Sequence, residues 1–163
     1  MTWDEACSDP FLAELPYKIE LNEFGHPILL SPHNRNHSAL QGIIQDLLRK
    51  HKEGGMVAQE AAVETAKGTR SADVAWMTIE RWRDQADGAS FSTAPQICIE
   101  VLSPTNSKAE MEEKRNLYFG AGADEVWICD LLGRMSFYRA DSPDEIASNS
   151  QSIPEFPNHV ELP

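Results

Sequence analysis

The chain has 163 residues, of which 41% are hydrophobic and 25% are charged, and its formal net charge is −12 at pH 7. This length suits one domain with a real core, and the composition excludes a disordered chain. The acidic balance argues against a broad, non-specific grip on nucleic acid, which depends on clustered lysine and arginine. Any contact with DNA therefore has to be local.

The sequence contains no run of about 18 apolar residues, and its first residues lack a basic segment followed by an apolar stretch. We therefore expect a cytoplasmic protein with no membrane partner. Its three cysteines form no CxxC pair, and Cys98 and Cys129 lie in apolar runs. Reduced, buried thiols are the expected state of these two residues.

The first 33 residues predict an extension ahead of the core. Residues 2–15 read as short helical turns broken at Pro10. Tyr17–Leu21 and Pro27–Ser31 then read as two short strands joined by a turn-like cluster. Together these two strands predict a β-hairpin.

A long amphipathic helix is predicted over Asn34–His51. Its apolar residues recur at helical spacing, and the pattern ends before Gly54 and Gly55. His37 belongs at the start of the same inward stripe. The structural alternative for His37 is a core-edge histidine that is hydrogen-bonded to the backbone.

The middle of the chain predicts a sheet. Met56–Glu64 and Arg70–Met77 read as an antiparallel pair of strands, and Gln96–Leu102 is nearly continuously apolar, as a central strand covered on both faces would be. Between them, residues 78–94 read as a surface loop with a short helix around Ile79–Arg83.

A second helix is predicted over Ser107–Gly122, because Ser107 and Glu110 form an S-x-x-E capping box. Lys114 projects into the middle of its apolar arc, where a charge is unexpected. Beyond this helix, Glu125–Cys129 reads as a buried strand and Met135–Arg139 as an edge strand. Residues 140–163 are rich in polar residues and proline, and they predict a loosely packed tail.

Asp73 and Glu100 each interrupt an apolar strand, so with Lys114 three ionisable groups point toward the interior. Buried charges are costly unless they are paired or bind a metal. Two converging carboxylates suit Mg²⁺ or Mn²⁺, with the Val101 carbonyl as a further ligand, and such an ion activates water for attack on a phosphoryl group. Lys114 could then orient that water or neutralise developing charge. The structural alternatives are a Lys–carboxylate pair, or a lysine that snorkels out to water along its stem.

Several stretches of the chain resemble one family. They are Pro95–Ser107, continuing through Lys114, Tyr118, Gly122 and Glu125–Asp130, together with Ser71–Trp76, His37 and Glu20. In these residues the chain resembles the Uma-two family of "putative restriction endonucleases", long catalogued as a domain of unknown function and placed in the PD-(D/E)XK nuclease superfamily. The resemblance covers Tyr17 to Pro163.

The resemblance implies an α/β fold with a restriction-endonuclease-like core, in which a central mixed sheet is flanked by helices. It also implies that Asp73 and Glu100 are metal ligands and that Lys114 is the catalytic lysine. Two departures from the pattern are evident: Leu102 stands where the superfamily lysine falls, and Ala72 stands where proline precedes the aspartate. Lys114 on the following helix replaces that lysine, as in the Uma-two pattern.

Four secondary candidates each have a structural alternative. Glu20 could approach the metal, or be an exposed strand glutamate. Ser103 could contact a phosphate, or cap the turn at Pro104. Tyr118 could serve catalysis, or belong to the core. His37 has the alternative already given.

These observations predict one domain over residues 1–163, with a nuclease core at 34–139. The expected function is a metal-dependent endonuclease that hydrolyses DNA phosphodiester bonds, and a homodimer is expected by analogy with the fold. A local basic path for DNA has five candidate residues, namely Arg35, Arg81, Arg83, Lys108 and Arg115. The competing hypothesis is a non-catalytic nuclease-fold module that acts in protein interaction or self-association.

Overall fold

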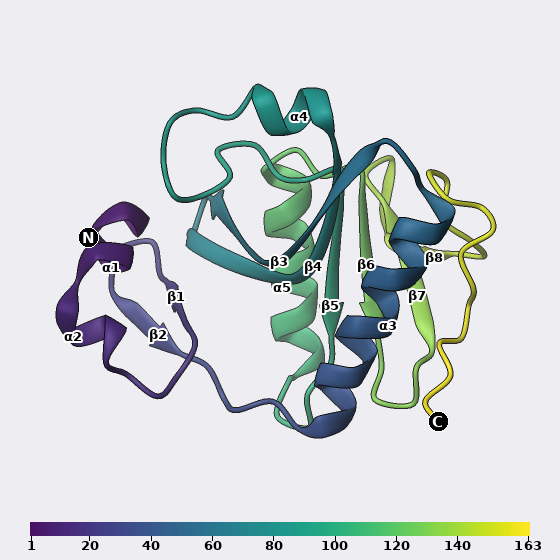
Figure 1. The fold of residues 1–163 in the computed structure, drawn as a ribbon, viewed down its shortest axis with the longest axis horizontal. Coiled ribbons are helices and arrows are strands. Elements are labelled where there is room, and N and C mark those ends of the chain that lie inside the picture. Colours follow the sequence, from purple (N-terminus) through teal and green to yellow (C-terminus); the bar gives the residue numbers. More distant parts are fainter.

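A six-stranded mixed sheet with the strand order β3-β4-β5-β6-β7-β8 forms the centre of the structure, a computed structural model that describes residues 1–163 (Figure 1). The helices are α1 (Trp3–Ser8), α2 (Pro10–Ala13), α3 (Arg35–His51), α4 (Ile79–Arg83) and α5 (Lys108–Gly120). The strands are β1 (Ile19–Leu21), β2 (Pro27–Leu29), β3 (Gly55–Thr65), β4 (Gly68–Thr78), β5 (Ile97–Val101), β6 (Glu125–Cys129), β7 (Met135–Arg139) and β8 (Ser142–Ala147). None of the helices has the length and apolar character that crossing a membrane requires.

Only β5 and β6 pair in parallel, and α5 makes the crossover between them. All other neighbouring strands of the sheet are antiparallel. Figure 1 shows α3 covering one face of the sheet and α5 the other. The mixed sheet with flanking helices and a separate β1–β2 hairpin confirms the predicted fold class.

The two long helices form where periodicity and capping both favour them. The Asn34 side chain accepts a hydrogen bond from the backbone N–H of His37 at 3.0 Å, which caps α3. At the start of α5, Ser107 and Glu110 form both bonds of the predicted capping box. Local sequence therefore fixes where each helix begins.

Two hydrophobic cores lie on opposite faces of the sheet. The larger core packs α3 against β4–β7, and its members include Leu40, Ile44 and Trp127, all fully buried. The smaller core lies beneath α5 and includes Met77 and Tyr118. Every residue of β5 is buried, which agrees with its predicted position as a central strand.

The prediction of a loosely packed tail after Ala140 is wrong. Strand β8 pairs with β7, so β7 is not the edge strand that the sequence predicted. Beyond β8, Ile153, Phe156 and Val160 are 1–2% exposed and belong to the larger core. The Phe156 ring lies 4.7 Å from the Trp127 ring, centroid to centroid. A few apolar anchors are thus enough to pack a segment whose overall composition is polar.

Candidate active site

The side chains of Asp73, Glu100 and Lys114 meet in one cavity of about 250 Å³. Strand β4 contributes Asp73, its neighbour β5 contributes Glu100, and α5 contributes Lys114. All three are buried, with exposed fractions of 3%, 5% and 9%. The predicted inward placement of the three charges is therefore present in the structure.

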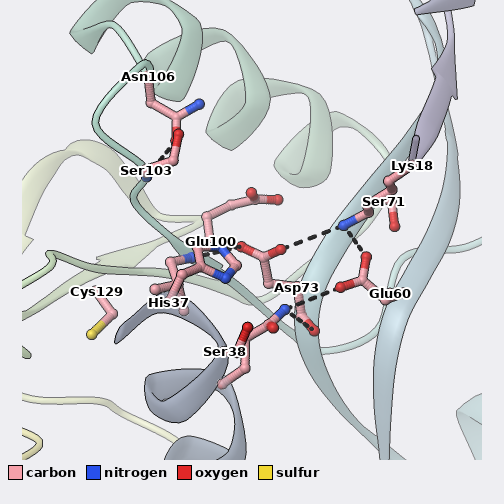
Figure 2. A network of polar contacts seen from close by, with 12 residues as sticks. Lys18, His37, Ser38, Glu60, Ser71, Asp73, Glu100, Ser103, Asn106 and Cys129 are labelled. Atoms are coloured by element: carbon pink, nitrogen blue, oxygen red, sulfur yellow. Dashed lines mark hydrogen bonds and ion pairs between the residues drawn. The ribbon is translucent and has the colours of Figure 1, made fainter. Parts of the chain in front are cut away.

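Asp73 is held on both carboxylate oxygens (Figure 2). Its Oδ2 accepts a hydrogen bond from the Val101 backbone N–H at 2.8 Å and lies 3.3 Å from His37 Nε2. Its Oδ1 lies 3.4 Å from Lys18 Nζ. Burial alone would raise the pKa of Asp73, but the His37 hydrogen bond and the Lys18 charge outweigh burial and lower it to about 2. Asp73 is therefore a stable anion.

Glu100 is held just as firmly, by two groups of α5. Its Oε1 accepts a hydrogen bond from the Tyr118 hydroxyl at 2.6 Å, and its Oε2 lies 3.1 Å from Lys114 Nζ. Burial and the negative charges of Asp73 and Glu20 raise the pKa of Glu100 to about 7, although Lys114 and Tyr118 act in the opposite direction. Asp73 and Glu100 thus differ widely in proton affinity within one cavity.

Lys114 is anchored by three groups. Its Nζ lies 2.9 Å from Glu20 Oε1 and 3.1 Å from Glu100 Oε2, and it donates to the Ser71 carbonyl at 3.3 Å. Burial works against its charge, but Glu100 and Glu20 raise the pKa of Lys114 above its ordinary value. Its ammonium group stays charged and held in place, and it does not snorkel to water.

Glu20 is 4% exposed, so the expectation of an exposed strand glutamate is wrong. Besides Lys114, it binds the Ser71 backbone N–H at 3.0 Å and lies 3.7 Å from Arg70 Nε. The cause is the docking of the β1–β2 hairpin against β4, which brings Glu20 to Lys114 and Ser71. Sequence alternation shows which strand face Glu20 occupies but cannot show what covers that face.

The other secondary candidates also have clear positions. His37 is 1% exposed, and the partner of its side chain is Asp73, so the backbone-bonded alternative is wrong. The Tyr118 hydroxyl binds Glu100 although its ring belongs to the smaller core. Ser103 lines the cavity, and its hydroxyl bonds to Thr105 and Asn106 within its own turn, as the capping alternative expects. Val101 reaches Asp73 through its N–H.

Three residues near Asp73 were not predicted from the sequence. Lys18 bridges Asp73 and Glu60 by ion pairs. Glu60 lies opposite Asp73 between two paired positions of β3 and β4, and its φ of +49° marks a local irregularity of the strand. His33 lies beside His37, with ring centroids 3.6 Å apart. The only signal for His33 is its position four residues before His37, just outside the helix.

The donors around Asp73 fit a divalent cation. Asp73, His37 and His33 each offer one ligand atom, and these three atoms lie within 4.8 Å of one another. His37 Nδ1 is buried and has no hydrogen-bond partner, so the protein satisfies only one of the two nitrogens of this ring. Carboxylate and imidazole groups are common ligands of divalent metals.

The predicted basic path is not gathered at the cavity. Arg81 donates to the carbonyls of Ala94 and Gly122, and Arg115 pairs with Asp144 at 3.0 Å. Lys108 and Arg115 line a larger hollow of about 560 Å³ between α5 and β6–β8, which shares Asn106 with the cavity. The larger hollow contains none of the three predicted catalytic side chains.

Two comparisons relate the chain to known proteins. Residues 10–161 match the model of a family described as "Uma2: Putative restriction endonuclease". The crystal structure of a "putative nuclease belonging to DUF820" from Anabaena variabilis superposes with a TM-score of 0.72, at 20% identity, over 98% of this chain and 94% of that one. This likeness supports the fold. Among curated proteins, none matches the chain.

Proposed function

Because the chain belongs to the Uma2 family, whose model matches residues 10–161, we propose that it is a metal-dependent endonuclease that hydrolyses phosphodiester bonds of DNA. One observation carries the proposal: two buried carboxylates with widely different proton affinities, Asp73 and Glu100, share a cavity with a fixed ammonium group, Lys114. Such clustering of perturbed groups in a cavity is typical of active sites.

Asp73 and Glu100 would be the protein ligands of the divalent ion, Mg²⁺ or Mn²⁺. Asp73 suits this role because it stays ionised, while its backbone partner Val101 fixes its orientation. Glu100 is oriented by Tyr118, whose hydroxyl occupies one of its oxygens. When bound, the ion supplies acidification of a water molecule and stabilisation of charge on a phosphoryl oxygen.

Lys114 would act on the phosphate or the attacking water. Its ammonium group is positioned by Glu20, Glu100 and the Ser71 carbonyl, so it needs no reorganisation when negative charge develops on the phosphate. Charges that are fixed in place before the reaction stabilise such charge more strongly than the mobile dipoles of bulk solvent do. Glu20 is then a positioning residue for Lys114.

The test is nicking of supercoiled plasmid by the purified chain with Mg²⁺ or Mn²⁺, and again after addition of EDTA. We expect cleavage with the ion and none with EDTA, and loss of cleavage in Glu100→Ala. The control is Glu155→Gln, which removes an exposed carboxylate that does not line the cavity. This variant should cleave like the parent. No nicking of any DNA by the parent with either ion would defeat the proposal.

One observation favours the alternative of a non-catalytic nuclease-fold module. Lys114 bonds directly to two carboxylates, Glu20 and Glu100, so the buried charges are already partly compensated without an ion. A manganese soak of crystals separates the two proposals. Anomalous density beside Asp73 and Glu100 supports the nuclease, and its absence at millimolar manganese supports the module.

A further inference from the structure

We propose that the ion-binding centre includes the imidazoles of His33 and His37 together with Asp73, and that it therefore selects Mn²⁺ and related transition ions over Mg²⁺. This inference deepens the proposed function and rests on it for the use of the ion. The binding of the ion itself can be measured without cleavage.

The distances suit a shared ion. Nitrogen and oxygen ligands lie about 2.1 Å from such an ion, so two adjacent ligands are about 3.0 Å apart in octahedral and about 3.4 Å apart in tetrahedral geometry. His37 Nε2 and Asp73 Oδ2 are 3.3 Å apart, between these two values. His33 completes a set of three ligand atoms within 4.8 Å of one another.

Two of the three donors are already held in place. The His37 ring is fully buried at the capped start of α3, where Asn34 binds its backbone N–H. Asp73 Oδ2 accepts a hydrogen bond from the Val101 N–H on one of its two lone pairs, and the other faces His37 Nε2, whose proton the ion would replace. Lys18 occupies the other oxygen, Oδ1, so Oδ2 is the atom left to face His37.

His33 differs from the other two donors because it lies nearer the surface, in the segment between β2 and α3. Its ring centroid lies 3.6 Å from that of His37, so both imidazoles face the same cavity, whose lining includes both residues. A partly exposed ring can rotate to meet an ion at low cost. His33 would therefore close the site from the solvent side.

The chemistry of these donors determines which ion fits. Mg²⁺ prefers oxygen ligands and gives up its waters reluctantly, whereas imidazole suits transition ions, whose affinity for a given site rises from manganese through iron and cobalt to nickel. A centre in which two imidazoles join the carboxylates should thus bind transition ions more tightly than a centre of carboxylates alone.

The test measures Mn²⁺ and Mg²⁺ binding to the full chain by titration calorimetry, and records pulsed electron paramagnetic resonance spectra of the Mn²⁺ complex. We expect Mn²⁺ to bind at least about tenfold more tightly than Mg²⁺, with hyperfine couplings from imidazole nitrogen. Loss of an outer-shell partner already weakens metal sites by about 10–100-fold. His33→Gln should therefore weaken Mn²⁺ binding by at least about tenfold.

The matched control is His26→Gln, an exposed histidine in the β1–β2 turn, which should leave both affinities unchanged. Thermal unfolding of each variant confirms that the fold is retained. Absence of nitrogen couplings, or a His33→Gln variant that binds Mn²⁺ like the parent, overturns the inference. If the inference fails but the parent still cleaves DNA with Mg²⁺, the proposed function stands. If imidazole-bound Mn²⁺ is observed but the parent cleaves no DNA, the inference stands and the proposed function is rejected.

Discussion

In the metal-free protein, Glu100→Gln should gain stability relative to the parent as pH rises. The pKa of Glu100 is raised from 4.5 to about 7 by burial, and each pKa unit corresponds to about 1.4 kcal/mol, so ionising this carboxyl in the folded protein costs about 3 kcal/mol. Below about pH 4.5 the carboxyl is protonated in both states and the cost is absent. It appears as pH rises toward 7, because the unfolded chain ionises first.

Glutamine keeps an acceptor for the Tyr118 hydroxyl and removes the charge, which makes it the matched substitution. Lys114 is charged at every pH used. Replacing its partner Glu100 with glutamine therefore adds an amount to the difference in free energy of unfolding that does not vary with pH. The assay is urea unfolding in EDTA between pH 4 and pH 8 for the parent, Glu100→Gln and the exposed control Glu155→Gln. The difference in unfolding free energy between Glu100→Gln and the parent should shift by about 3 kcal/mol in favour of the variant. A difference that is constant with pH would refute this reasoning.

Three further predictions address the neighbouring contacts. Lys114→Met should abolish cleavage and lower the free energy of unfolding at pH 8 by about 3–5 kcal/mol, because it leaves Glu20 and Glu100 without their cation; a variant that cleaves normally contradicts the role of the lysine. Tyr118→Phe removes a hydrogen bond that lowers the pKa of Glu100, so the pH profile of cleavage should move to higher pH, and an unmoved profile would count against this contact. Phe156→Ala should destabilise the fold by about 3–5 kcal/mol in urea unfolding, whereas a change below about 0.5 kcal/mol would mean that the final segment is not part of the core.

The elements with a strong periodic or capping signal could be predicted from the sequence. The bounds predicted for β6 and β7 agree with the structure, and α3 begins one residue after its predicted start because Asn34 is its cap. The segment after Ala140 could not be predicted in the same way. Its few apolar residues are not periodic, and their burial depends on the surface that β6, β7 and α3 jointly present.

The site shows the same division. Inward placement of Asp73, Glu100 and Lys114 follows from alternation and helical periodicity, and the structure brings all three to one cavity. The partners that hold them depend on tertiary contacts. Lys18 reaches Asp73 and Glu20 reaches Lys114 only because the β1–β2 hairpin docks against β4, and no local pattern encodes that docking.

The central claim is that Asp73 and Glu100 support DNA cleavage with a divalent ion. The most direct measurement compares the nicking rates of supercoiled plasmid by the parent, Asp73→Ala and Glu100→Ala in Mg²⁺ and in Mn²⁺, with circular dichroism confirming that each variant is folded. We predict ion-dependent nicking by the parent and none above background by either folded variant. Nicking by either variant at the parent's rate would contradict the claim.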